Sequence, residues 1–302
     1  MSLEDQNVTP FGRFKGLIGD TPLALLHSLN PRDDVTIYGK LEGTNLGGSV
    51  KDRAAFGMIT AAEESGALRG KTIVEATSGN TGIALAMIAS LKGLPIKLVM
   101  PNTATRERVA TMRAYGAEVQ LVEGGMERAI DLARSLHQEG THLMLNQFGN
   151  DANPEMHFRS TGPEIYKATS GSVTHFVSAM GTTGTIMGTS RYLKSRDPTV
   201  KIIGVQPAGE SKIPGIRRWS QEYLPTIFEP QRVDHILDVQ SEEAMETARR
   251  LTREEGIFCG PSSGGSCWAA LQVAKAAPSG SVIVFIVCDR GDKYLSMENL
   301  FS

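Results

Sequence analysis

The alternation of short apolar runs with amphipathic segments is the feature that most constrains how this chain can fold. Runs rich in β-branched residues are separated by stretches in which apolar residues recur with helical spacing. In the first half, the expected strands are 72–76, 95–100, 118–122 and 142–145, and the expected helices are 81–92, 103–115 and 127–138. Strands that alternate with helices in this way form parallel sheets flanked by helices, so we expect an α/β fold.

The same alternation resumes after a polar, loop-like stretch at residues 146–154. Further strands are expected at 174–179, 201–206 and 282–287, with helices at 185–194, 242–255 and 264–277. The interruption predicts a boundary between two α/β lobes. The longest irregular connection, 212–230, is rich in proline and aromatic residues, and long connections in compact folds are often functional.

Composition excludes several classes of protein. The net charge is -2 and the basic residues are scattered, so nucleic acid is not an expected partner. No apolar run reaches the ~20 residues that span a bilayer, and the N-terminal segment has no signal-peptide core, so we expect a soluble, cytoplasmic protein without membrane contact. Cys259, Cys267 and Cys288 are an odd number without paired metal spacing, which indicates reduced thiols and no metal site.

One lysine stands where it can become chemically reactive. Lys51 follows a glycine-rich turn and opens an apolar, helix-periodic run that continues to about Gly66. A lysine that is partly buried there spends time as the neutral amine and can form an imine. Taken alone, Lys51 also fits a lysine whose stem lies along the protein surface at a helix start.

Two strand-to-helix turns are candidates for anion binding. The turn 77–81, TSGNT, precedes an apolar helix whose free N–H groups suit a carboxylate. The turn 181–185, GTTGT, has two glycines and three hydroxyls that can cradle a phosphate without lysine or arginine. Its spacing differs from the loops that bind ATP or NAD. Simple helix capping is the alternative for both turns.

A third turn, 259–265, places Ser262 at the start of a helix. The GxSxG pattern of a serine nucleophile is absent, and His175 and His235 are expected to be structural. A serine facing a pyridine nitrogen would leave that ring unprotonated, which favours elimination over transamination. An imine-forming lysine, a neutral phosphate cradle, a carboxylate turn and this serine together match pyridoxal 5'-phosphate.

The chain resembles the fold-type II pyridoxal-phosphate enzymes, and within them the B-type cysteine synthases, or O-acetylserine sulfhydrylases. The resemblance rests on IGDTPL at 18–23, SVKDR at 49–53, MGTTGT at 180–185, GIRRW at 215–219 and CDRGDKYLS at 288–296. Leu46 and Lys293 depart from the residues common in the family, away from the expected cofactor contacts. The resemblance implies two lobes like those of tryptophan synthase β, each a mostly parallel twisted sheet flanked by helices: a smaller mobile lobe at 45–152, which would bind the substrate carboxylate, and a larger lobe at 1–44 plus 153–302, which would bind the cofactor phosphate.

The resemblance also implies a reaction and a set of roles. Cysteine would form from O-acetylserine and sulfide by β-replacement through an aminoacrylate. Lys51 would carry the cofactor as an imine and then act as the base. The other cofactor contacts would be Asn80 to the ring hydroxyl oxygen, Gly181, Thr182, Thr183, Gly184 and Thr185 to the phosphate, and Ser262 to the pyridine nitrogen. The substrate carboxylate would be bound by Thr77, Ser78, Thr81 and Gln147.

Three further residues are candidates for choosing the sulfur donor. A guanidinium suits an oxyanion such as thiosulfate or a phosphoryl leaving group, so Arg217 and Arg218 predict formation of S-sulfocysteine as well. Two solvated arginines are the alternative. Cys288, at the end of a strand, would limit the size of the nucleophile or would be only a small buried residue.

Other interpretations stay open at this point. An O-phosphoserine-dependent cysteine synthase, a cystathionine β-synthase-like enzyme and a serine/threonine dehydratase share the fold. A non-catalytic relative that binds the C-terminal tail of serine acetyltransferase is a different class, although Lys51 and the complete cradle favour an enzyme. The resemblance implies a homodimer, and it makes serine acetyltransferase a candidate partner.

Overall fold

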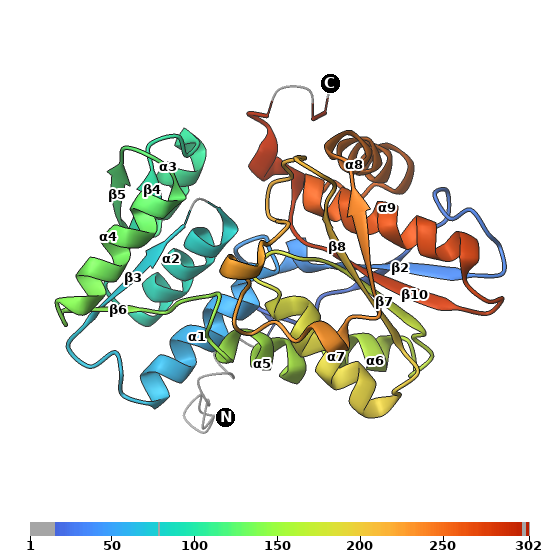
Figure 1. Ribbon diagram of the computed structural model, residues 1–302, viewed down its shortest axis with the longest axis horizontal. Coiled ribbons are helices and arrows are strands. Elements are labelled where there is room, and N and C mark those ends of the chain that lie inside the picture. The colour runs from blue at the N-terminus through green and yellow to red at the C-terminus, as the bar shows by residue number, and fades with distance from the viewer. Residues whose placement is uncertain (1–15, 78, 298–299, 302) are drawn as a thin grey trace, which may run out of the picture.

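Two sheets stand side by side in the computed structural model, which describes residues 16–77, 79–297 and 300–301 (Figure 1). The smaller sheet has the strand order β5-β4-β3-β6, and all of its neighbouring strands are parallel. Its strands are β3 (Thr72–Ala76), β4 (Ile96–Pro101), β5 (Glu118–Val122) and β6 (His142–Met144). In β3 and β4 the register pairs Ile73 with Ile96 and Ala76 with Val99, so apolar side chains line both faces.

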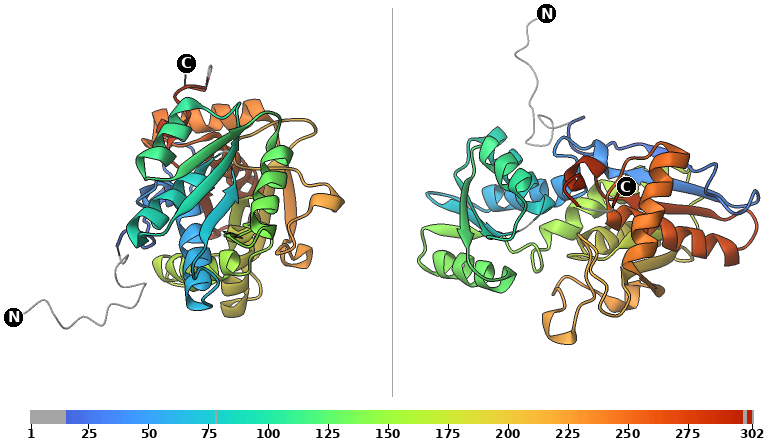
Figure 2. Two further views of the ribbon diagram at one scale, coloured as in Figure 1. Left: turned by 90° about the vertical axis from the view of Figure 1, so that its left-hand side faces the viewer. Right: turned by 90° about the horizontal axis from the view of Figure 1, so that it is seen from above.

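The larger sheet has the order β1-β2-β10-β7-β8-β9, and only its β1–β2 pair is antiparallel. Its strands are β1 (Leu23–Leu25), β2 (Thr36–Leu41), β7 (His175–Ala179), β8 (Lys201–Pro207), β9 (His235–Val239) and β10 (Val282–Val287). The sheet therefore combines the N-terminal strands with strands from the second half of the chain. Figure 2 shows the smaller sheet and its helices standing to one side of this larger layer.

Helices cover both faces of each sheet. The smaller sheet lies between α2 (Asn80–Lys92) and α4 (Met126–Gln138), with α1 (Lys51–Glu64) and α3 (Arg106–Ala114) packed against α2 in the same core. The larger sheet lies between the pair α8 (Ser241–Glu255) and α9 (Pro261–Ala276) and the group α5 (Ala152–Arg159), α6 (Thr161–Ala168) and α7 (Gly184–Arg196). Helix α2 is buried on almost every side, as expected of a helix that is apolar all round. The predicted fold class is confirmed.

A buried network of charges fixes the start of α1. The guanidinium of Arg53 is fully buried and forms ion pairs with Glu42 at 2.7 Å and with Glu164 at 2.7 Å. Lys40 pairs with the same Glu164 at 2.6 Å. Burial disfavours the charged form of Glu42, but the Arg53 charge outweighs it and lowers the pKa of Glu42 to about 2. The network ties α1 to β2 and α6, and thereby holds the residues that precede Arg53.

The structure contains several elements that the sequence-based expectation did not include. Residues 152–154, expected in a loop, form the first turn of α5, where Pro154 needs no intrahelical N–H partner. Strands β1, β2 and β9 and helix α6 had not been predicted. The long connection after β8 is irregular as expected, apart from the short 3-10 turns η3 (Gln221–Tyr223) and η4 (Pro230–Arg232).

Candidate active site

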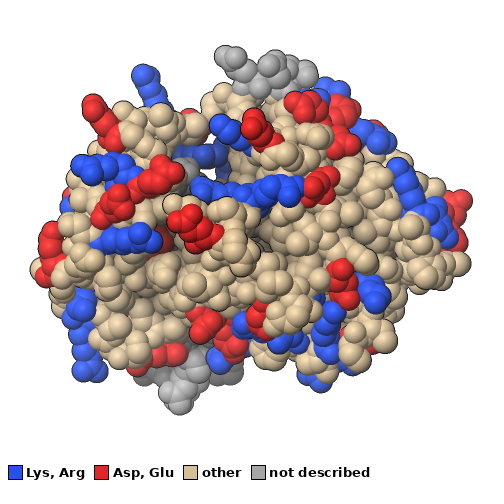
Figure 3. All heavy atoms as spheres, viewed as in Figure 1, with Lys and Arg blue, Asp and Glu red and all other residues tan. Residues whose placement is uncertain are grey.

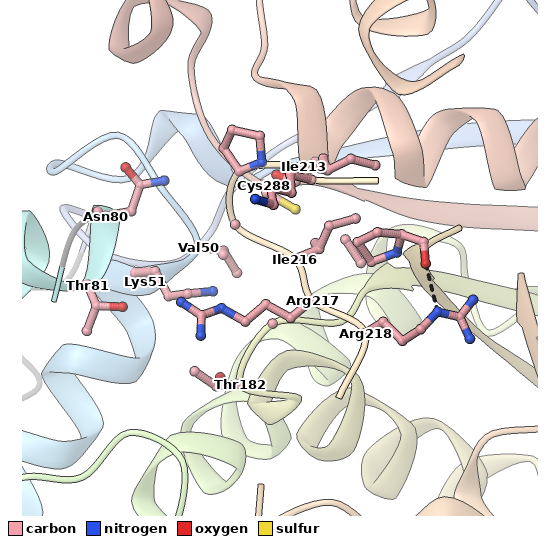
Figure 4. A pocket seen from close by; sticks show the side chains of 18 of the residues that line it. Val50, Lys51, Asn80, Thr81, Thr182, Ile213, Ile216, Arg217, Arg218 and Cys288 are labelled. Atoms are coloured by element: carbon pink, nitrogen blue, oxygen red, sulfur yellow. Dashed lines mark hydrogen bonds between the residues drawn. The ribbon is translucent and has the colours of Figure 1, made fainter. Parts of the chain in front are cut away.

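One cavity collects the turns that the sequence analysis singled out. It has a volume of about 730 Å³ and lies where the carboxyl ends of strands from both sheets face each other. Its wall is formed by the start of α1, the turn between β3 and α2, the turn between β7 and α7, the first turn of α9 and the end of β10. Figure 4 shows residues from both sides converging on this space.

Lys51 is the first residue of α1, and its side chain lines the cavity. The preceding backbone is fixed to the end of β10, because the N–H of Val50 donates to the carbonyl of Cys288 at 2.8 Å. Burial lowers the pKa of the Lys51 amine, although Cys288 and Asp289 act in the opposite direction. The amine is therefore more accessible in its neutral, nucleophilic form than that of a solvated lysine.

The turn at residues 77–81, called the carboxylate-type turn below, presents two threonines to the cavity. The hydroxyl oxygen of Thr77 accepts the N–H of Gly82 at 3.2 Å, so its own proton is available to another acceptor. The hydroxyl of Thr81 donates to the side-chain oxygen of Gln147 at 2.8 Å, which brings together two residues predicted to act on one group. All three polar side chains line the cavity. Ser78, predicted to act with them, lies outside the described residues.

Glu75 supports the Gln147 turn from behind and was missed in the sequence. Its carboxyl accepts the N–H of Asn146 at 3.0 Å and that of Gln147 at 3.5 Å. Burial raises the pKa of Glu75 to about 7, and the backbone hydrogen bonds only partly offset this. A charged residue in the middle of a predicted buried strand is the signal that points to such a group.

Asn80 lies on the cavity wall with its side-chain amide turned towards Asp289. The amide donates to Asp289 Oδ2 at 2.6 Å, and the hydroxyl of Tyr294 donates to the same oxygen at 2.5 Å. Burial raises the pKa of Asp289. Asp289 therefore connects the smaller sheet's α2 to the C-terminal segment of the larger layer, a link that the sequence did not reveal.

The turn at residues 181–185, called the phosphate-type turn below, divides into two groups of residues. Gly181, Thr182 and Thr185 line the cavity. Thr183 and Gly184 belong to the bend behind them, where Thr183 has a left-handed φ of 70° and Gly184 begins α7. The buried hydroxyl of Thr183 has no hydrogen-bond partner among the described residues. The turn thus offers hydroxyls and a helix N-terminus, the donor set expected for a phosphate bound without a cation.

Ser262 and Cys288 are neighbours on the cavity wall. Ser262 is in the first turn of α9, after Pro261, and is 3% exposed. Burial raises the pKa of the Cys288 thiol to about 11, while a hydrogen bond with Ser262 opposes the rise. Cys288 is therefore a neutral thiol at physiological pH.

The two neighbouring arginines have different environments. The Arg218 guanidinium donates to the carbonyl of Pro207 at 3.0 Å and forms an ion pair with Asp238, so it is held away from the centre of the cavity. Arg217 extends towards Lys51 and Thr182 (Figure 4). These positions separate two residues that the sequence could not distinguish.

Basic side chains gather across the opening between the lobes (Figure 3). Arg108 of α3 and Lys212 line the cavity together with the two arginines just described, and Glu210 is the acidic residue among the described lining residues. The segment that carries Arg217 is joined to the phosphate-type turn by Trp219. The Trp219 Nε1 donates to the carbonyl of Gly181 at 2.7 Å, and the Arg217 guanidinium lies 5.5 Å from the Trp219 ring. An anion entering the cavity therefore meets positive charge.

Comparison with known proteins agrees with this geometry. The sequence model of the pyridoxal-phosphate dependent enzymes matches residues 14–289. The chain belongs to this family. Cysteine synthase B of Pseudomonas aeruginosa is 57% identical over 282 residues, covering 92% of this chain and 94% of that protein. Cysteine synthase B of Escherichia coli is 54% identical, covering 92% and 93%.

Solved structures show the same fold. The cysteine synthase of Entamoeba histolytica superposes with a TM-score of 0.91 at 36% identity, covering 100% of this chain and 94% of that one. An O-ureido-L-serine synthase gives a TM-score of 0.89 at 36% identity, covering 95% and 93%. Together with the B-type relatives, these matches confirm the predicted enzyme class, a transferase of the cysteine synthase kind, and pyridoxal phosphate as its cofactor.

The residues of the cavity fit that cofactor. An amine with a lowered pKa, at Lys51, faces a helix N-terminus preceded by neutral donors. The buried Thr183 hydroxyl is a donor that lacks a partner among the described residues, as expected beside a bound phosphate. The roles of individual residues, the lobe boundaries, the homodimer and the cytoplasmic location stay predictions. Every helix in the described part of the chain is too short or too polar to cross a bilayer.

Proposed function

We propose that this protein makes L-cysteine from O-acetyl-L-serine and sulfide by replacing the group on the β-carbon. The observation that carries the proposal is the placement of Lys51 in one cavity between a carboxylate-type turn and a phosphate-type turn. In this arrangement a substrate held by its carboxylate presents its α-carbon to the lysine amine. When bound, pyridoxal phosphate supplies the electron sink that makes an α-proton removable.

The proposed roles follow from the position of each group. Lys51 binds the cofactor and, once released by the incoming amino acid, takes the α-proton as its neutral amine. Thr77 and Thr81, with Gln147 and with Ser78 of the same turn, bind the α-carboxylate, and Asn80 binds the ring hydroxyl oxygen. The 181–185 turn holds the phosphate. Ser262 faces the pyridine nitrogen as a neutral partner, so the ring is not held cationic.

The chemistry after proton removal needs a dry site. The bound cofactor would supply the chemistry by which acetate leaves the β-carbon and the sulfur of the donor takes its place. Water competes with the donor unless the lobes close over the substrate. Closure of the predicted 45–152 lobe is expected when the carboxylate binds, because the residues that would bind it belong to that lobe.

Arg217 is the proposed contact for an anionic sulfur donor. Its guanidinium extends into the cavity, whereas that of Arg218 is bound to Pro207 and Asp238. Thiosulfate would then add to give S-sulfocysteine. For Arg217→Ala we expect kcat/KM with thiosulfate to fall about tenfold to a hundredfold further than with sulfide, the usual effect of removing a charged hydrogen bond. Arg218→Ala is the matched control, and equal losses for both donors in Arg217→Ala would contradict this role.

Product analysis tests the function as a whole. Protein loaded with pyridoxal phosphate and supplied with O-acetylserine and sulfide should release equal amounts of acetate and L-cysteine. Acetate accompanied by pyruvate and ammonia, without cysteine, would instead indicate an eliminating enzyme of the dehydratase kind. Faster turnover of O-phosphoserine than of O-acetylserine would favour the phosphoserine-dependent alternative.

A further inference from the structure

Two buried polar residues of α5 stand behind the two threonines of the phosphate-type turn that line the cavity. The side-chain amide of Asn153 donates to the hydroxyl oxygen of Thr182 at 3.1 Å. One turn further along α5, His157 Nε2 lies 3.3 Å from the hydroxyl oxygen of Thr185. Asn153 and His157 are each 1% exposed. Neither side chain lines the cavity, so any effect on a ligand passes through the threonines.

Glycines in α7 make this close approach feasible. A Cβ on Gly184 would lie 2.0 Å from the side-chain oxygen of Asn153, and one on Gly188 would lie 1.9 Å from the carbonyl of Pro154. Gly184 and Gly188 are one helical turn apart on α7, and this spacing matches that of Asn153 and His157 on α5. The two helices are therefore shaped to bring a polar pair of one against the first turn of the other.

The hydrogen bonds of Asn153 determine where the Thr182 proton goes. Asn153 Nδ2 also donates to the carbonyl of Gln147 at 2.9 Å, which fixes the amide nitrogen, a group that only donates, on this side. The Thr182 oxygen accepts from that nitrogen and, more weakly, from the N–H of Gly184 at 3.4 Å. With its acceptor sites occupied, the hydroxyl has its own proton left to donate, and the cavity is the side that Thr182 faces.

His157 can act on Thr185 in the same way. Burial, reinforced by the charge of Arg53, lowers the pKa of His157 to about 3, so the ring is neutral and carries one proton. Its Nδ1 lies 2.8 Å from the hydroxyl of the fully buried Thr161. If Thr161 donates to Nδ1, then Nε2 carries the proton and donates to Thr185, which again leaves the Thr185 hydroxyl as a donor. The other tautomer would make Thr185 donate backwards into the ring.

We propose that Asn153 and His157 are positioning residues that orient the hydroxyls of Thr182 and Thr185 as hydrogen-bond donors towards the cofactor phosphate. This inference rests on the proposed role of the 181–185 turn. A phosphate only accepts hydrogen bonds, so hydroxyls that are fixed as donors bind it better than hydroxyls that rotate freely. It explains how the turn can hold a dianion with neutral groups.

Two substitutions of His157 separate this role from simple packing. Glutamine can place an amide nitrogen near the position of Nε2, whereas asparagine is too short and retains only a partner for Thr161. Equilibrium dialysis of the full-length holoenzyme against pyridoxal phosphate should show a Kd raised about tenfold in His157→Asn, and within about threefold of wild type in His157→Gln. Phosphorus NMR of the bound phosphate should shift in the first variant and not in the second. Equal Kd values in both variants would overturn the proposal.

The matched control is His175→Asn, because His175 also contacts a threonine hydroxyl, that of Thr174 at 2.8 Å, but does not line the cavity. It should leave Kd and the phosphorus signal unchanged. Circular dichroism shows whether His157→Asn folds. If it does not, Asn153→Leu supplies a second test, because it removes the hydrogen bond from the Asn153 amide to the Thr182 hydroxyl oxygen. A Kd unchanged in Asn153→Leu would overturn the Asn153 role.

A double-mutant cycle distinguishes failure of this inference from failure of the proposed function. Thr185→Val should itself raise the Kd, and His157→Asn should add little in the Thr185→Val background, because both changes remove the same hydrogen bond. If Thr185→Val leaves the Kd unchanged, the proposed phosphate cradle is wrong. If Thr185→Val raises the Kd and His157→Asn adds its full effect independently, only the positioning role is wrong.

Discussion

Replacement of Glu75 by glutamine should remove a large part of the pH dependence of stability. Glu75 is 1% exposed, and burial raises its pKa from 4.5 to about 7. Between these two pH values the folded chain holds a proton that the unfolded chain has lost. The contribution of Glu75 is therefore fully present below pH 4.5 and is lost as the pH rises through about 7.

The size of the effect follows from the two pKa values. At about 1.4 kcal/mol for each pH unit between them, the wild type loses about 3 kcal/mol through Glu75. Glutamine resembles the protonated acid in shape and does not titrate. The thermal midpoint of the wild type, relative to that of Glu75→Gln, should consequently fall by about 5 °C between pH 4.5 and pH 8 for a chain of this length.

Differential scanning calorimetry of both proteins across this pH range measures the difference directly. Glu139→Gln, which replaces an exposed carboxylate at the end of α4, is the control and should give a flat difference. A flat difference for Glu75→Gln as well would show that Glu75 does not hold a proton in the folded state. A difference that changes in the opposite direction would refute the assignment of burial as the dominant cause.

Three further predictions concern packing and binding. Glu42→Gln leaves the buried Arg53 charge with less compensation and should lower the free energy of unfolding by about 3–5 kcal/mol, measured by urea denaturation. Gly188→Ala places a Cβ 1.9 Å from a backbone carbonyl of α5, and it should lower the thermal midpoint by roughly 2–5 °C. Thr81→Val removes the hydrogen bond to Gln147 and should raise KM for O-acetylserine about tenfold with the thermal midpoint little changed; an unchanged KM would contradict its role at the carboxylate.

The sequence predicted the central strands well because burial on both faces leaves a clear pattern. Strands β3 and β10 lie inside their sheets and occupy the residues expected of them, and both are buried runs that contain valine and isoleucine. Strand β9 is a half-exposed edge strand, and β1 has only three residues, so neither has a comparable signal. Helix α5 was obscured by polar residues and by Pro154 in its first turn, where proline does not interrupt a helix.

The site could be predicted only as far as local motifs extend. Each of the three turns, at Lys51, at 77–81 and at 181–185, is a continuous stretch of sequence that can be recognised by itself. The structure brings all three to one cavity. Arg218 differs from Arg217 because it contacts Pro207 of β8 and Asp238 of β9. Two arginines that are adjacent in the sequence give no sign of these contacts. Glu75, Asn153, His157 and Asp289 were missed because their contacts arise from packing between elements rather than from a motif.

Attachment of the cofactor to Lys51 is the central claim, and chemical trapping tests it most directly. Protein incubated with pyridoxal phosphate would be reduced with borohydride, digested and analysed by mass spectrometry. The expected result is one modified peptide carrying the reduced cofactor on Lys51, with no labelled peptide and no visible imine absorbance in Lys51→Ala. Labelling of a different lysine, or an imine band that persists unchanged in Lys51→Ala, would contradict the account.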